Sequence, residues 1–253
     1  TCMGFDDQWH GTIRQILGSF YFKFFIKKLI DFAWIAGPPQ YFYARKFGFS
    51  NERIIYNLLS SFFCYDFIPN TLEGKNNVTK FIFVGRLVRE KNLKNLLQAF
   101  SLIDSSLFHL EIVGDGPLFN DLVKYAKQNI IFRGYLPPVS VINQLKSSDV
   151  FIMPSIHEQW SVAVHEAVSL GLVLNSSKHV GANSRFLIEG YNGFSFNPLS
   201  VDSIKESIIR ILALSNRELL EMKSNSFSLS KGITPKMAAF SFISMNYKYD
   251  NFN

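Results

Sequence analysis

Two glutamates, Glu158 and Glu166, lie eight residues apart around the expected start of a short helix. A carboxylate accepts hydrogen bonds from the vicinal hydroxyls of a sugar or a ribose more strongly than a neutral side chain does. Backbone N–H groups around Ser161 and Val162, at the start of that helix, would also attract an anion. If Glu158 lies in the loop and Glu166 in the helix, both can border one cavity. The pair therefore predicts a binding site for a ligand rich in hydroxyl groups.

A second candidate site is the segment Gly85–Asn92, which carries the cations Arg86 and Lys91. Gly85 lets the chain turn sharply and lets a ligand approach the backbone. Two cations beside the N-terminus of a following helix can bind a phosphate group. Lys and Arg also decorate such loops where no ligand binds. The segment is thus compatible with a phosphate site and with an ordinary basic loop.

Other motifs point to structure more than to chemistry. The run Gly114–Pro117 has glycines for a tight turn and a proline suited to the first position of a helix. It lacks the G-x-G-x-x-G pattern of nicotinamide cofactors, and no such cofactor is expected. His157 and His165 have no third ligand at a matching spacing, so we expect surface or packing histidines and no metal site. Cys2 and Cys64 match no metal or redox spacing and suit a reducing compartment.

The elements that would position these residues follow a regular rhythm from residue 79 onward. Short apolar runs rich in Ile, Val and Phe alternate there with amphipathic stretches of helical period. The runs, expected to be strands, are 79–84, 109–113, 130–134, 149–154, 172–176 and 193–197. The helical stretches are 91–104, 117–128, 138–147, 162–170, 182–189, 200–214, 216–229 and 235–248. This alternation predicts a doubly wound α/β fold with a parallel sheet, whose ligands bind beyond the carboxyl ends of the strands.

Residues 1–70 resemble the back part of a second domain of the same kind. Their expected elements are a helix at about 10–30, a strand around Ala33–Ile35 and a helix that begins at Pro38–Pro39. The polar stretch 71–77 is the best linker, and the chain opens with Thr, so we expect the first half of the N-terminal domain to be absent. The expected parts are a partial N-terminal Rossmann-like domain (1–77), a ligand-binding Rossmann-like domain (78–230) and a C-terminal helix packing back toward the N-terminal part (231–253).

The composition excludes several classes of protein. Hydrophobic residues make up 47% of the 253 residues and the net charge is +6, so neither disorder nor a nucleic-acid footprint is expected. The most apolar stretch, 16–36, contains three lysines and an aspartate, which excludes an uncharged transmembrane run. It is compatible with an amphipathic helix at a membrane surface or with a core-facing helix whose lysines lie at its rim. We favour the core-facing helix.

Five segments occur together in an order that carries more information than any one of them. They are VGRLVREKN (84–92), VGDGP (113–117), IIFRGYLP (130–137), SSDVFIMPSIHEQWSVAVHEAVSLGLVLNSS (147–177) and GANSRFLIEGYNGFSF (181–196). This series resembles the glycosyltransferases of family 4, the "group 1" transferases of the GT-B fold. Two further segments, MGFDDQWHGTIRQ (3–15) and FAWIAGPPQYFYARKFGF (32–49), are similar to acceptor-domain segments of the bacterial surface-polysaccharide branch.

The resemblance implies a role for individual residues. Arg86 and Lys91, with Gly85, would bind the donor diphosphate, Glu166 the nucleotide ribose and Glu158 the donor sugar. Phe132 and Arg133 would lie beside the base, with the backbone of Ser161 and Val162 in the same cavity. Asp6 and Asp7 fall near the position of a loop histidine that faces the donor sugar in many relatives, and His10 is a less suitable substitute. The chain departs from the family pattern at Gln159-Trp160-Ser161, where Gly-Phe-Gly is commoner, and at Arg185, where many relatives have Glu.

The implied function is retaining transfer of a sugar from a nucleoside diphosphate donor to a glycan or lipid-linked acceptor in cell-surface polysaccharide synthesis. No metal is expected, because two fixed cations can replace a divalent ion beside the diphosphate. A donor-nucleotide-binding fragment without transferase activity and a GT-B sugar-nucleotide epimerase are the alternatives. We expect a cytoplasmic protein, at the inner face of the cytoplasmic membrane if the amphipathic stretch makes peripheral membrane contact.

Overall fold

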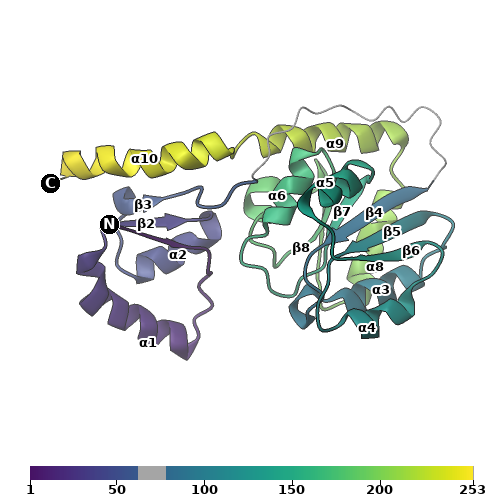
Figure 1. Ribbon diagram of the computed structural model, residues 1–253, viewed down its shortest axis with the longest axis horizontal. Helices are drawn as coiled ribbons and strands as arrows, with labels where there is room; N and C mark the ends of the chain where they lie inside the picture. The colour runs from purple at the N-terminus through teal and green to yellow at the C-terminus, as the bar shows by residue number, and fades with distance from the viewer. Residues whose placement is uncertain (62–77, 253) are drawn as a thin grey trace. The chain divides into compact units, whose positions relative to one another are not determined.

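The computed structural model describes residues 1–61 and 78–252 of the chain (Figure 1). The chain divides into two compact units, Thr1–Cys64 with Gly232–Asn253 and Tyr65–Lys231. The expected linker at 71–77 and the residue Cys64 lie outside the described residues. Each unit is built around its own parallel sheet.

The larger unit contains one sheet of six parallel strands in the order β6-β5-β4-β7-β8-β9 (Figure 1). The strands are β4 (Thr79–Val84), β5 (Phe108–Val113), β6 (Ile130–Gly134), β7 (Val150–Met153), β8 (Val173–Ser177) and β9 (Gly193–Phe196). Each coincides with one of the six apolar runs, so the predicted doubly wound α/β fold is confirmed. The chain reverses its direction across the sheet between β4 and β7, and such a reversal is where open α/β sheets bind ligands.

Helices cover both faces of this sheet (Figure 1). On one face α3 (Leu93–Ser101) packs against α8 (Val201–Leu212), and on the other α6 (Val162–Ser169) packs against α9 (Asn216–Ser230). The remaining elements are α4 (Phe119–Leu122), α5 (Pro138–Lys146), α7 (Asn183–Phe186) and the 3-10 helices η4 (Arg89–Lys91) and η5 (Val123–Tyr125). Several helices are shorter than predicted: the one expected at 91–104 begins at Leu93, because Asn92 adopts a left-handed conformation with φ 54°.

The smaller unit contains three parallel strands in the order β1-β2-β3. The strands are β1 (Cys2–Phe5), β2 (Phe32–Ile35) and β3 (Ile54–Ile55). The helices are α1 (Ile13–Tyr21), the π-helix η1 (Phe22–Ile26), the 3-10 helices η2 (Lys27–Leu29) and η3 (Asn51–Arg53), α2 (Pro38–Lys46) and α10 (Pro235–Phe252). The sequence predicted β2 and α2, but it did not predict the short outer strands β1 and β3.

α10 packs on the sheet of the smaller unit although it is the last helix of the chain. The side chain of Met245 is buried together with Phe32 and Ile55. The ring of Phe242 lies 5.3 Å from that of Trp34, measured between centroids. Burial of these apolar side chains holds α10 against β2 and β3.

α1 differs from the core-facing helix that we favoured. Its buried side chains are polar, Gln15 and Ser19, whereas Ile13, Leu17 and Phe20 are 77%, 66% and 63% exposed. The inward face is polar because Gln15 bonds the preceding loop, its amide donating to the carbonyl of Gln8 at 2.7 Å. The prediction of a core-facing helix is therefore wrong for α1, but it is confirmed for Phe22 of η1, which is buried in the core of the smaller unit. No helix within residues 1–61 or 78–252 is both long enough and apolar enough to cross a bilayer.

Candidate functional site

The loops after β4 and β5 pack so closely that glycine is required between them. A Cβ atom on Gly114, whose φ is 134°, would lie 1.9 Å from the carbonyl oxygen of Gly85. A Cβ on Gly116 would lie 2.7 Å from the carbonyl oxygen of Leu87, whose N–H donates to the carbonyl of Asp115 at 2.9 Å. The GDGP segment therefore supports the loop that carries Arg86 and Lys91, beyond forming its own turn.

Lys91 and Glu158 meet where the sheet reverses direction. Lys91 ends η4 in the loop after β4, and Glu158 lies in the loop after β7. The Lys91 ammonium forms an ion pair with a carboxylate oxygen of Glu158, and the two side chains are only 18% and 16% exposed. The hydroxyl of the fully buried Ser155 also points to this oxygen, at 3.5 Å. The structure thus brings together one predicted phosphate ligand and one predicted sugar ligand.

Arg86 lies at the start of the same loop and is exposed. Within the part of the chain that the structure describes, its guanidinium makes neither an ion pair nor a hydrogen bond. The loop therefore has one cation engaged with a carboxylate and one that is available to an anion. A diphosphate could accept hydrogen bonds from the fork of Arg86 as well as from Lys91.

Glu166 lies in α6, just over one turn from its first residue Val162. The carboxyl group is half-buried, and this burial raises the pKa of Glu166. No other residue in the described ranges forms a hydrogen bond or an ion pair with this carboxyl group. A buried carboxylate without a partner destabilises the folded protein, and such groups are common at binding sites. Glu166 is thus placed to accept hydrogen bonds from a ligand.

The loop between β7 and α6 has a fixed and partly strained conformation. The carbonyl of Glu158 accepts from the N–H of Gly181 at 3.0 Å, and that of Trp160 from Ala182 at 2.9 Å. Ser161, the last loop residue, has a φ of 87°, which is costly for a residue with a Cβ atom. The Trp160 side chain is 1% exposed. The departure from Gly-Phe-Gly thus adds a buried indole and backbone strain immediately before Val162.

Phe132 and Arg133 lie on β6, at the outer edge of the sheet and two strands from β4. The ring of Phe132 meets that of Phe119 edge to face, with centroids 6.2 Å apart. The guanidinium of Arg133 donates to Glu111 on β5 at 2.8 Å, and this bond holds the pKa of Arg133 above its usual range. Both residues lie near the carboxyl end of β6. None of the interactions described joins either side chain to Lys91 or to Glu158.

Asp6 and Asp7 belong to the smaller unit, where they follow β1 at its carboxyl end. The backbone carbonyl of Asp6 accepts from the side-chain amide of the fully buried Gln40 at 2.8 Å. Burial raises the pKa of Tyr43, and the negative charge of Asp7 adds to this effect. His10 lies in the smaller unit too, and the remaining candidate residues lie in the larger unit.

His157 and His165 lie in different surroundings. His165 is 1% exposed and its ring stacks on Phe186 at 4.4 Å, whereas His157 is exposed and lies 3.0 Å from the side chain of Gln159. No three His, Cys, Asp or Glu side chains within 1–61 and 78–252 are grouped to hold a metal ion. His165 thus packs inside the larger unit and His157 lies at its surface.

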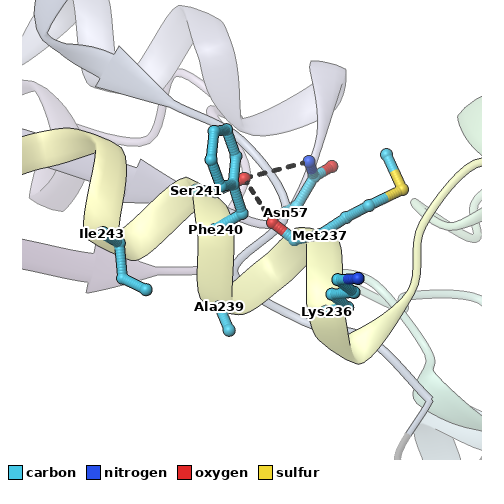
Figure 2. A pocket seen from close by; sticks show the side chains of 7 residues that line it. All are labelled: Asn57, Lys236, Met237, Ala239, Phe240, Ser241 and Ile243. Atoms are coloured by element: carbon cyan, nitrogen blue, oxygen red, sulfur yellow. Dashed lines mark hydrogen bonds between the residues drawn. The ribbon is translucent and has the colours of Figure 1, made fainter.

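A groove of about 600 Å³ in the smaller unit runs along α10 (Figure 2). Ser241 fixes one side of it: its hydroxyl accepts from the Asn57 amide at 3.3 Å and donates to the carbonyl of Met237 at 2.9 Å. The groove is lined by Asn57, Lys236, Met237, Ala239, Phe240, Ser241 and Ile243. None of these is a predicted site residue, and the lining is mostly apolar, so it offers few groups to a nucleotide.

Comparison with known proteins places the sequence among sugar transferases. The pattern of the family described as "Glycosyl transferases group 1" matches residues 66–227. The chain is 33% identical over 150 residues to the UDP-Gal:alpha-D-GlcNAc-diphosphoundecaprenol alpha-1,3-galactosyltransferase of Escherichia coli, covering 54% of this chain and 37% of that protein. It is 28% identical over 182 residues to the lipopolysaccharide 1,2-N-acetylglucosaminetransferase of Salmonella typhimurium, covering 66% and 48%. The chain spans less than half the length of either relative.

Solved structures share the fold. Sucrose-phosphate synthase from Thermosynechococcus elongatus matches with a TM-score of 0.79 at 16% identity, over 100% of this chain and 68% of that one. The apo form of the lipopolysaccharide outer core galactosyltransferase WaaB matches with a TM-score of 0.72 at 21% identity, over 88% and 63%. These likenesses confirm the GT-B fold that the sequence resemblance implied. Because the family pattern covers well over half of its residues, the chain belongs to the group 1 glycosyl transferases.

Proposed function

We propose that this chain carries the donor site of a retaining glycosyltransferase, which moves a sugar from a nucleoside diphosphate to a glycan or lipid-linked acceptor. The observation that carries the proposal is the Lys91–Glu158 ion pair between the loops after β4 and β7, with Arg86 exposed in the same loop. The name of the Escherichia coli relative describes a UDP-galactose donor and a diphosphoundecaprenol-linked acceptor. That name supports a nucleotide-sugar donor and a lipid-linked acceptor, and the lipopolysaccharide in the name of the Salmonella typhimurium relative supports a role in cell-surface polysaccharide synthesis.

Donor binding would exchange partners at this site. The diphosphate takes the Lys91 ammonium from Glu158 and binds the Arg86 guanidinium, while the backbone at Gly85 allows its close approach. Glu158, released from the lysine, accepts a hydrogen bond from the donor sugar. Glu166 accepts hydrogen bonds from the ribose hydroxyls, which compensates its burial. Phe132 and Arg133 would flank the base, and Ser161 and Val162 would present backbone N–H groups.

The transfer step breaks the bond between the anomeric carbon and the diphosphate oxygen. An acceptor hydroxyl oxygen forms the new bond to that carbon on the same face, and its proton passes to the departing phosphate oxygen. Negative charge develops on the diphosphate as the bond breaks. Once the donor is bound, Arg86 and Lys91 already lie beside the diphosphate, so they stabilise that charge without further reorganisation during the reaction. Glu158 would hold the sugar, and Asp6 and Asp7 are the acceptor-side candidates for the reacting centre.

The Glu166 assignment predicts two opposite effects of one substitution. Glu166→Gln should weaken nucleoside diphosphate binding, because an amide accepts hydrogen bonds from ribose less strongly than a carboxylate. The same change should raise the melting temperature of the free protein at neutral pH. Burial raises the folded-state pKa of Glu166, so the free energy of unfolding falls as pH rises from the unfolded to the folded pKa. The glutamine removes this loss.

Titration calorimetry and thermal unfolding at two pH values check this prediction. The stabilisation should be present at about pH 8 and absent at about pH 3.5, where the carboxyl is protonated in both states. Glu206→Gln, a change at an exposed glutamate of α8, is the control and should alter neither quantity. Unchanged affinity in Glu166→Gln would show that Glu166 does not bind the ribose.

We also propose that the segment formed by α1, η1 and η2 binds anionic lipid at the inner face of the cytoplasmic membrane. The exposed side chains of this segment combine apolar and basic residues, as in helices that lie in the membrane interface. The apolar ones are Ile13, Leu17, Phe20, Phe24, Phe25 and Leu29, and the basic ones are Arg14, Lys23 and Lys28. A lipid-linked acceptor would be presented at such a surface.

Vesicle flotation tests the membrane proposal. We expect the protein to float with vesicles that contain anionic lipid and not with neutral vesicles, and high salt should release it. Lys23→Gln with Lys28→Gln should weaken binding about 30-fold, since each lysine near the surface contributes about 1 kcal/mol. Phe20→Ser with Phe24→Ser should abolish flotation, whereas Phe240→Ser, at an exposed phenylalanine of α10, should not. Equal flotation with neutral and anionic lipid would contradict the proposal.

A further inference from the structure

The side chain of Asn92, at the end of the loop after β4, connects that loop to the loops after two other strands of the sheet. Its backbone is left-handed, with φ 54° and ψ 32°, so it ends η4 and starts α3 in one residue. Its side-chain amide donates to the carbonyl of Pro154 at 3.2 Å and to that of Pro198 at 2.7 Å. These carbonyls lie in the loops after β7 and β9. One side chain therefore ties the loops of three strands together.

This clamp lies next to the residue that matters for phosphate binding. The N–H of Asn92 donates to the carbonyl of Arg89 at 3.0 Å and that of Lys91 to Val88 at 3.1 Å, which closes the η4 turn. The carbonyl of Glu90 accepts from the N–H of Ile156 at 2.9 Å, so η4 is held to the loop after β7 at a second point. The backbone that carries Lys91 is thus fixed on both sides.

We propose that Asn92 is a positioning residue for Lys91: its amide clamp holds the lysine where the donor diphosphate binds. The inference rests on the proposed function, because it assigns the diphosphate to Lys91. A lysine on a free backbone loses conformational entropy when it binds, and a fixed backbone reduces that loss. Asparagine meets both local requirements, since it tolerates the left-handed conformation and has two N–H donors for two carbonyls.

Two substitutions separate the clamp from the backbone conformation. Asn92→Gly keeps the left-handed conformation and removes the amide. Asn92→Asp keeps the side-chain shape but puts a carboxylate against two carbonyl oxygens. In titrations with whichever of UDP, GDP and ADP binds most tightly, each variant should bind about 5- to 12-fold more weakly, the scale of ordering one long side chain. Binding of the matching nucleoside, which lacks the phosphates, should stay within about twofold.

A double-mutant cycle with Lys91→Ala shows whether Asn92 acts through the lysine. In the Lys91→Ala background, Asn92→Gly should weaken diphosphate binding by less than about twofold, because the residue it positions is gone. Asn95→Ala is the matched control: its amide also donates to the carbonyl of Pro198, at 3.2 Å, but it lies inside α3. This control should bind the diphosphate like the unmodified protein.

The outcomes distinguish the inference from the function on which it rests. If Lys91→Ala leaves diphosphate affinity unchanged, the proposed function fails. If Lys91→Ala weakens binding and Asn92→Gly does not, the inference fails alone. It also fails if Asn92→Gly weakens diphosphate binding equally with and without Lys91, or weakens the nucleoside as much as the diphosphate, since either result indicates a merely structural role.

Discussion

Alanine at Arg86 or at Lys91 is expected to lower kcat/KM for sugar transfer about 30- to 1,000-fold, equivalent to about 2–4 kcal/mol of transition-state stabilisation. The physical reason is the charge that develops on the departing diphosphate. Lys91 is the last residue of η4, and Arg86 follows Gly85, whose backbone lies close against Gly114. Losing a preorganised charge partner affects the transition state more than the ground state.

Transfer from a radiolabelled nucleotide sugar, measured in the full-length protein, checks this expectation. Lys94→Ala is the matched control, since Lys94 is an exposed cation only three residues beyond Lys91, in α3. It should leave kcat/KM within about twofold. If neither Arg86→Ala nor Lys91→Ala changes kcat/KM beyond that range, these residues do not hold the diphosphate.

A second large effect is expected on the free energy of unfolding. It concerns an ion pair near the amino ends of β4 and β7 in the same sheet. The ammonium of Lys223 on α9 lies 3.2 Å from a carboxylate oxygen of Asp149, just before β7, and the two side chains are only 4% and 3% exposed. The other carboxylate oxygen accepts from the N–H of Lys80 on β4 at 3.1 Å. Lys223→Met should lower the free energy of unfolding by about 3–5 kcal/mol, because it removes the opposite charge from a buried carboxylate.

Denaturant unfolding of three variants checks the origin of this loss. Adding Asp149→Asn to Lys223→Met should recover most of the stability, since the amide oxygen still accepts from Lys80 and carries no charge. Lys205→Met breaks the Lys205–Asp202 pair, in which Asp202 is 77% exposed, and should cost less than about 1 kcal/mol. A loss for Lys223→Met no larger than that of Lys205→Met would contradict the account of the buried pair.

The sequence predicted the large sheet well, because buried parallel strands are continuous apolar runs. β4 and β7 are examples: TKFIFV and VFIM stand out against the amphipathic stretches around them. β3 escaped notice because it has only two residues. β1 escaped notice because its residues are exposed or half-buried and do not form a continuous apolar run. α1 was misjudged because apolar periodicity shows that a helix has two faces but not which face the protein buries.

The residue types of the site could be predicted from the sequence, but the contacts between these residues could not. Glycine and basic residues after β4 and glutamates after β7 indicated phosphate and hydroxyl binding. That Lys91 meets Glu158 depends on β4 lying beside β7, which follows from the strand order of the whole sheet. Asn92 gave one local signal that could have been used, since asparagine is one of the residues that adopt the left-handed conformation at the end of a helix. Its two carbonyl partners are distant in sequence and could not be predicted.

A crystal structure of the protein with a bound nucleoside diphosphate sugar tests the donor-site assignment most directly. The account predicts that the diphosphate lies within hydrogen-bonding distance of Arg86 and Lys91, that the ribose hydroxyls contact Glu166, and that Glu158 has exchanged the lysine for the donor sugar. A nucleotide bound elsewhere, with the Lys91–Glu158 pair intact, would contradict it.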